Sequence, residues 1–195
     1  MNTEAVERVA DAILFEGYLL YPYRKSALKN QRRWDFGLLY PPGREADNEP
    51  SCFQTEFLAD SPADAMVEVQ IRFLHTFVCG ASSASREAVS RSISTPAVPL
   101  WRLVAYPFHL AFEFPADIAL GQQAIEGSVE LSARRLEHRL YRCSLHIRNC
   151  TSSLSDTPAE RRMKALASVH AILGITNGEF VSLLDPPESY TGAAA

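Results

Sequence analysis

Residues 67–79 carry a long alternating pattern, which constrains the fold of this chain more than any other feature. The odd positions are apolar apart from one histidine: Val67, Val69, Ile71, Phe73, His75, Phe77 and Cys79. The even positions include the polar residues Glu68, Gln70, Arg72 and Thr76. A period of two over this length predicts a long β-strand with one buried face. The chain must therefore contain a sheet and a second layer that covers it.

Three shorter alternating stretches predict further strands, over residues 108–114, 125–131 and 140–150. In the last of these, Tyr141, Cys143, Leu145 and Ile147 share one face. No clear crossover helix separates the four strands, so we expect an antiparallel sheet packed on one side by a second sheet or by helices. The serine-rich stretch 80–95 is ambiguous: residues 86–93 suit either a short helix or a mobile loop.

Helical patterns lie at the two ends of the chain. Residues 4–16 place apolar side chains at helical spacing and are followed by Gly17. Thr157-Pro158-Ala159-Glu160 fits a capping box with proline at the first helical position, and an apolar stripe continues to Gly174. Asn177-Gly178 then predicts a turn before the strand-like run FVSLL.

We therefore expect an α+β protein with a mostly antiparallel, β-sandwich-like core. An N-terminal helix precedes this core, and a C-terminal helix followed by a hairpin completes it. Residues 1–195 are expected to form a single domain with three parts. These are an N-terminal helix and aromatic–basic segment (1–41), the sheet core (64–151), and a C-terminal helix and strand (157–187).

Composition narrows the function classes. A net charge of −4 with 22% charged residues describes an ordinary globular protein and argues against a general nucleic-acid binder. No run approaches the roughly 20 apolar residues that span a bilayer, and the first residues are acidic rather than basic, so we expect a cytoplasmic protein. The four cysteines (Cys52, Cys79, Cys143 and Cys150) form no CxxC pair and are expected to be free thiols.

The sequence contains none of the common catalytic or nucleotide-binding motifs, and we predict no catalytic residue and no cofactor. Two alternatives stay open. One is a metal site that draws on His146, Cys150 and the distant Cys52. The other is a pocket lined by His75, Cys79, Cys143 or His146, as in a small-molecule or metal-binding enzyme acting on a cofactor precursor.

The stretch Ala12–Pro41, here called the aromatic–basic segment, is the strongest candidate for a binding surface. It mixes tyrosines and a tryptophan with arginines and lysines, and no carboxylate falls between Tyr18 and Trp34. Three interpretations remain: core or edge aromatics beside a solvated loop, a protein-interaction surface, or a platform for single-stranded nucleic acid.

Three stretches carry a family resemblance. VADAILFEGYLLYPYRKSALKNQRRWDFGLLYP opens the chain, LHIRNCT follows at 145–151, and HAILGITNGEFVSLLDPP lies at 170–187. Together they resemble an uncharacterised bacterial protein family encoded beside nickel–iron hydrogenase genes. Longer members continue past the DPP motif, so this chain resembles a short member. The resemblance implies a role in hydrogenase biogenesis, assembly or structure, and it supplies no catalytic residues.

The hypothesis from sequence is a non-enzymatic accessory protein that binds a nickel–iron hydrogenase subunit or maturation intermediate. The alternatives are the enzyme described above and a single-stranded nucleic-acid-binding module. The oligomeric state stays open. The predicted partner-binding residues all lie in the aromatic–basic segment: Tyr21, Tyr23, Arg24, Lys29, Asn30, Arg33 and Trp34.

Overall fold

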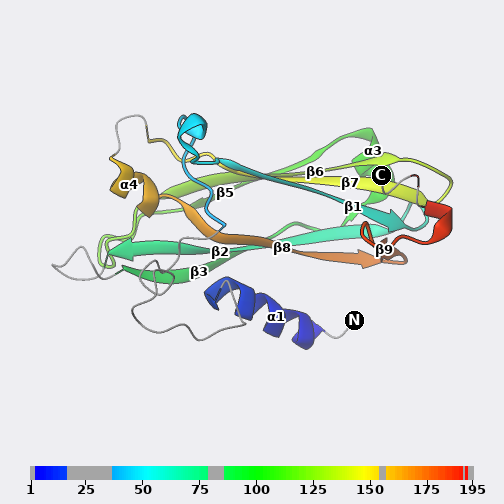
Figure 1. Cartoon of the computed structure of the whole chain (residues 1–195), viewed down its shortest axis with the longest axis horizontal. Coiled ribbons are helices and arrows are strands. Elements are labelled where there is room, and N and C mark those ends of the chain that lie inside the picture. Colours follow the sequence, from blue (N-terminus) through cyan, green and yellow to red (C-terminus); the bar gives the residue numbers. More distant parts are fainter. Residues whose placement is uncertain (1–2, 17–36, 79–85, 154–156, 191, 193–195) are drawn as a thin grey trace.

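The computed structural model describes residues 3–16, 37–78, 86–153, 157–190 and 192 of the chain (Figure 1). Strands predominate over helices among these residues, and every paired strand runs antiparallel to its neighbour. The predicted α+β class with mostly antiparallel sheets is confirmed.

One sheet has five strands. Their spatial order is β5 (Phe108–Phe114), β6 (Ile125–Arg135), β7 (Leu140–Asn149), β1 (Cys52–Asp60) and β9 (Glu179–Val181). The strands predicted over 108–114, 125–131 and 140–150 are confirmed. The inward face predicted for β7 is also correct, because Tyr141, Cys143, Leu145 and Ile147 are all buried.

The second sheet is built around the long strand that the alternation predicted. β2 (Met66–Val78) pairs with β8 (Leu166–Thr176) along one edge, and with β3 (Arg86–Ser94) and β4 (Val98–Pro99) along the other. The odd residues of β2 from Val67 to Phe77 are buried. This strand is therefore the centre of its sheet.

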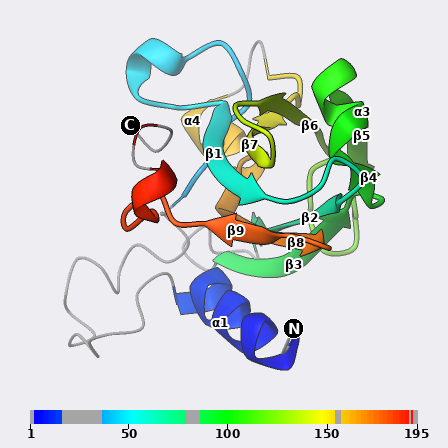
Figure 2. The ribbon, with the colours of Figure 1, turned by 90° about the vertical axis from the view of Figure 1, so that its right-hand side faces the viewer.

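The two sheets lie face to face (Figures 1 and 2), and one hydrophobic cluster contains inward side chains of both. The ring of Phe73 on β2 lies 6.0 Å from that of Phe112 and 5.8 Å from that of Phe114, both on β5. The short helix α3 (Leu100–Ala105) adds two fully buried leucines to the cluster. Each large apolar side chain buried in this way contributes roughly 1.5–3 kcal/mol.

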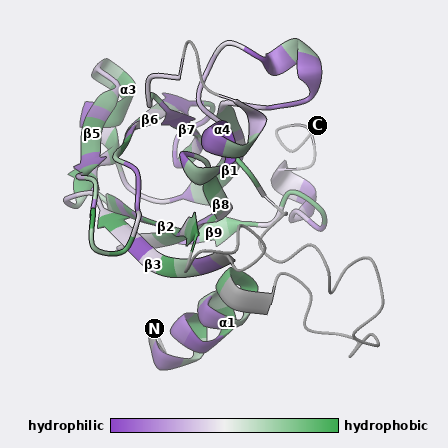
Figure 3. Cartoon of the chain, turned by 90° about the vertical axis from the view of Figure 1, so that its left-hand side faces the viewer, coloured by the Kyte–Doolittle hydropathy of each residue, from purple (hydrophilic) through white to green (hydrophobic). Residues whose placement is uncertain are grey.

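Helix α1 (Thr3–Glu16) covers the outer face of the four-stranded sheet (Figure 2), which confirms the helix predicted over 4–16. Its Leu14 packs with Leu74 of β2 and Ala167 of β8 in a second cluster. This cover buries the outer face of β2 at Leu74, and α4 (Pro158–Met163) adds to it at Thr76, whose hydroxyl lies 3.5 Å from the carbonyl oxygen of Arg162. Figure 3 shows that α1 carries hydrophilic as well as hydrophobic residues, as expected of a helix with one face towards solvent.

The prediction of a short helix or a mobile loop within residues 80–95 is wrong for residues 86–94, which the structure describes. Residues 86–94 form β3, whose register with β2 sets Phe73 opposite Arg91 and His75 opposite Val89. An arginine at an inward position hides the alternation of this strand. Pairing with β2 therefore decides its conformation more than local preference does.

The prediction of a long C-terminal helix is also wrong. The capping box between Thr157 and Glu160 is present, but helix α4 (Pro158–Met163) is short. The apolar residues after it form β8, because pairing along β2 stabilises them more than a helix would. The expected hairpin does not form either: the Asn177-Gly178 turn leads from β8 in one sheet to β9 in the other.

Candidate functional site

The seven predicted partner-binding residues all fall within residues 17–36, which lie outside the described part of the chain. These are Tyr21, Tyr23, Arg24, Lys29, Asn30, Arg33 and Trp34. The residues that flank this stretch are described, and they show where its two ends attach.

A β-bulge in β8 forms the attachment point. Arg72 pairs with His170 and Leu74 with Ala167, so Ser168 and Val169 together stand opposite a single residue of β2. Ser168 has a φ of 54°, in the left-handed region that non-glycine residues rarely adopt. Bulges of this kind redirect backbone groups away from the regular ladder and are frequent beside functional sites.

Described residues on both sides of this stretch are held by the two bulge residues. The hydroxyl of Ser168 donates to the carbonyl oxygen of Ile13 near the end of α1, at 3.1 Å. The amide of Val169 donates to the carbonyl oxygen of Gly37, also at 3.1 Å. Gly37 has a φ of 53°, and a Cβ there would lie 3.4 Å from the Ser168 Cα. Ile13 and Gly37, which lie on either side of residues 17–36, therefore contact the same place on β8.

Polar contacts fix α1 to the sheet beside the bulge. Asp11 of α1 forms an ion pair with Arg72 of β2. His170 is half-buried, and its Nδ1 donates to the carbonyl oxygen of Ser168 at 2.9 Å. Burial lowers the pKa of His170, so its ring is neutral near pH 7 and does not repel Arg72.

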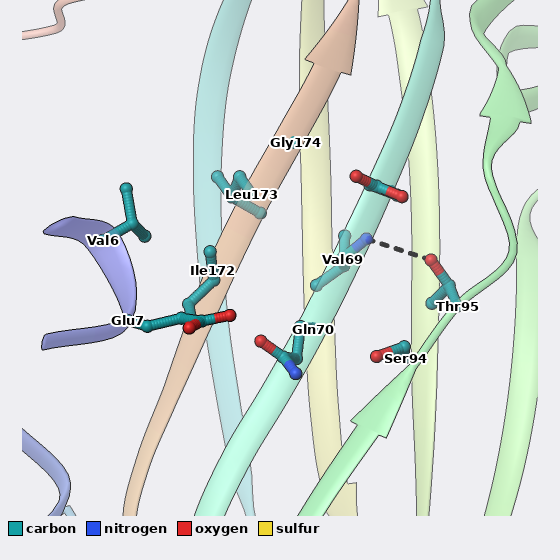
Figure 4. A pocket seen from close by; sticks show the side chains of 10 residues that line it. Val6, Glu7, Val69, Gln70, Ser94, Thr95, Ile172, Leu173 and Gly174 are labelled. Carbon is teal, nitrogen blue, oxygen red and sulfur yellow. Dashed lines mark hydrogen bonds between the residues drawn. The ribbon is translucent and has the colours of Figure 1, made fainter. Parts of the chain in front are cut away.

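A groove with a cavity volume of about 190 Å³ lies between α1 and the two strands β2 and β8 (Figure 4). Val6, Ile172 and Leu173 give it an apolar side. The amide nitrogen of Gln70 donates to Ser92 at 3.0 Å, and its amide oxygen points towards Glu7 in Figure 4. Chemically, this groove suits a side chain that has an apolar stem and a cationic hydrogen-bond donor, such as lysine or arginine.

A buried arginine holds the chain that follows the aromatic–basic segment. Arg161 of α4 is 2% exposed. Its Nε donates to Glu49 at 2.7 Å, and its two terminal nitrogens donate to the carbonyl oxygens of Pro41 and Pro42 and to the hydroxyl of Ser153. We call this set of contacts the Arg161 junction.

Asn149, at the end of β7, extends this arrangement. Its amide nitrogen donates to the carbonyl oxygens of Leu39 at 2.9 Å and Lys164 at 2.8 Å, and its amide oxygen accepts from Thr151 at 3.0 Å. Stretches that carry the family resemblance therefore meet here, since Leu39 belongs to the first and Asn149 to the second. Neither Arg161 nor Ser168 stood out in the sequence, because an arginine in a short helix and a serine in a strand carry no distinctive pattern.

The residues proposed for an enzymatic pocket do not all point into the core. His75 and Cys143 are fully buried on inward faces of the two sheets, and burial raises the pKa of Cys143 to about 12. His146 lies on the opposite face of β7 from Cys143, as the strand alternation requires. Cys79 lies outside the described residues.

The proposed metal site is not assembled among the residues that the structure describes. There, no three or more histidine, cysteine or acidic side chains are placed to hold a metal ion. Cys52 and Cys150 are exposed free thiols. Of the described helices, none is long and apolar enough to span a bilayer.

Comparison with known proteins adds no family assignment: no protein-family model, no curated protein and no solved structure matches this chain.

Proposed function

We propose that this chain is a non-enzymatic accessory protein that binds a nickel–iron hydrogenase subunit or maturation intermediate through the aromatic–basic segment. The observation that carries the proposal is the attachment of both ends of the segment to one bulge in β8, through Ser168 and Val169. The hydrogenase context comes from the family resemblance of the three sequence stretches.

The anchoring supports a binding role for physical reasons. A segment with both ends fixed has fewer conformations to lose when it meets a partner, so more of the contact energy is left for affinity. Tyrosine, tryptophan and arginine are the residue types that dominate interface hot spots. We also infer that the two facing sheets act as a rigid, β-sandwich-like scaffold beneath the segment.

The outer surface of α1 supports the same location. Val9 is 60% exposed and Ile13 is 45% exposed, and they lie one helical turn apart on a face that the sheet does not cover. The groove beside Glu7 and Gln70 offers acceptors next to the same helix. A partner with apolar side chains would complement Val9 and Ile13, and one of its lysine or arginine side chains would fit the groove.

A retention experiment tests the proposal. The purified, tagged chain should retain a hydrogenase subunit from an extract, and Arg33→Glu combined with Trp34→Ala should abolish retention. The matched control is Trp101→Ala with Arg102→Glu, which changes an adjacent tryptophan and arginine exposed on α3. Circular dichroism and thermal melting must show that both variants fold. Normal retention by the Arg33/Trp34 variant would remove the segment from the interface.

The two alternative functions, a small-molecule or metal-binding enzyme and a single-stranded nucleic-acid-binding module, stay predictions. Each has its own test. A stoichiometric transition metal in protein purified without chelator would favour the enzyme. Salt-sensitive retention on single-stranded oligonucleotides would favour the nucleic-acid module.

A further inference from the structure

Three polar side chains meet inside the protein, between the two sheets. His75 comes from β2, Arg91 from β3, and Gln122 from the loop between β5 and β6; we call them the His75 cluster. Because Phe73 pairs with Arg91 and His75 with Val89, the side chains of His75 and Arg91 lie diagonally on the same inward face. The cluster is separate from the aromatic–basic segment.

The β5–β6 loop closes over this end of the core. Asp117 and Gln122 exchange two backbone hydrogen bonds of 3.1 and 2.8 Å, which turn the loop back on itself. Gln122 is 3% exposed, and its amide oxygen accepts from a terminal nitrogen of Arg91 at 3.0 Å. The guanidinium of Arg91 also lies 4.9 Å from the centre of the Phe114 ring.

Several nitrogen atoms in the cluster are buried without a hydrogen-bond partner among the described residues. They are Nε of Arg91, Nε2 of Gln122, and the two ring nitrogens of His75, whose approach to the Gln123 backbone falls short of hydrogen-bond geometry. Leaving a buried polar atom unpaired costs about 1–3 kcal/mol, so such atoms in native proteins usually meet an ordered water or an ion. Within the described part of the chain, Arg91 also has no carboxylate partner.

The hydrogen-bonding capacity and the charge of these atoms indicate which kind of ligand would fit. The Arg91 guanidinium and the Gln122 amide nitrogen can only donate hydrogen bonds, and the guanidinium is permanently charged. An acceptor with a negative charge would satisfy both donors and offset the partly buried cation. A metal cation would be repelled. Burial and the charge of Arg91 lower the pKa of His75 to about 4, opposed by the nearby backbone of Gln123, so the ring is neutral near pH 7 and adds no repulsion.

We propose that the His75 cluster is a binding site for a small anion, held by the Nε of Arg91 and the amide nitrogen of Gln122 with the His75 ring beside it. This site goes beyond the proposed function, and its test does not depend on a protein partner.

The test is an anion titration of the full chain at constant ionic strength. Chloride, formate and inorganic phosphate are each exchanged against gluconate, a bulky anion. The readouts are the NMR signal of the Arg91 Nε–H group and the melting temperature. We expect at least one probe to shift the signal saturably and to raise the melting temperature. No saturable shift with any of the three would overturn the proposal and leave water as the occupant.

Variants locate the site. Arg91→Met should weaken anion binding at least tenfold, measured by the melting-temperature titration. Arg134→Met, which changes an exposed arginine on β6, should leave binding intact. Should Arg91→Met fail to fold, Gln122→Leu removes the second donor and should also weaken binding. Equal binding by wild type and both cluster variants would show that the anion binds elsewhere.

Discussion

Arg161 and Arg91 both place guanidinium nitrogens in the interior of this protein, but the two side chains meet different surroundings. Arg161 donates to a carboxylate, a hydroxyl and two backbone carbonyl oxygens. Arg91 donates to one amide oxygen, lies over an aromatic ring, and keeps a buried Nε–H group without an acceptor among the described residues.

The difference separates a structural role from a binding role. A buried charge is tolerated when interactions with its partners offset the free-energy cost of removing it from water. The Arg161 junction meets that condition within the protein itself, since it joins the Pro41–Pro42 loop, Glu49 and Ser153 to α4. The His75 cluster does not meet it among the described residues, which is why we propose a bound anion there. The same substitution at the two arginines therefore tests the comparison directly.

The largest effect is expected at Arg161. Arg161→Met keeps most of the side-chain volume but leaves Glu49 and two carbonyl oxygens without their donor. Removing one partner of a buried ion pair typically costs about 3–5 kcal/mol, and we expect a loss of this size in the free energy of unfolding. Urea denaturation measures it. A loss below about 1 kcal/mol would show that the junction is not structural.

The next effect concerns pH and His75. The ring has a folded pKa of about 4 and an unfolded value near 6.5, so the unfolded chain binds a proton first as the pH falls. The free energy of unfolding should therefore decrease between pH 6.5 and 4, by up to about 3 kcal/mol, and His75 should contribute nothing further below pH 4.

Denaturation curves of wild type and His75→Leu across this range isolate the contribution. The variant should lose the part of the pH dependence that belongs to His75. His138→Leu, which removes an exposed histidine, should keep the wild-type slope. Parallel slopes for wild type and His75→Leu would contradict the buried, neutral state of this ring.

A smaller loss is expected at Asn149. Asn149→Ala leaves the amide of Thr151 and the carbonyl oxygen of Lys164 without the partners that Asn149 supplies. Leu39 still accepts from Leu166, so the cost should be about 2 kcal/mol in urea denaturation. Asn149→Asp should cost at least as much, because a carboxylate would face two carbonyl oxygens. Wild-type stability of the aspartate variant would disprove the donor role of Asn149.

The sequence predicted those elements whose pattern coincides with their packing. β2 and β7 alternate along their length because one face of each meets the shared core. The capping box at Thr157 is readable because its two hydrogen bonds join residues only three apart. Along β8, the local pattern favours a helix but tertiary pairing favours a strand, and the prediction from the local pattern was wrong.

The candidate sites were harder to predict from the sequence for the same reason. The bulge at Ser168 arises from pairing between β8 and β2, which are nearly a hundred residues apart in the chain. The His75 cluster depends on a strand that the serine-rich sequence concealed and on a loop that folds over it. Single residues such as Arg91 and Arg161 look alike in sequence, and only their surroundings distinguish them.

The smallest effect on stability is expected at Arg91. Its size tests whether Arg91 and Arg161 have different roles. Arg91→Met gives up the hydrogen bond to Gln122 and the contact with the Phe114 ring, but it also removes a cation that lacks an acceptor. Removing a half-buried cation that lacks a full set of acceptors also removes the cost of taking that charge partly out of water. In gluconate buffer, the change should therefore stay within about 1 kcal/mol of wild type, against several for Arg161→Met. The two variants differ only in which guanidinium they remove. A loss at Arg91 as large as that at Arg161 would mean that the protein already satisfies both arginines.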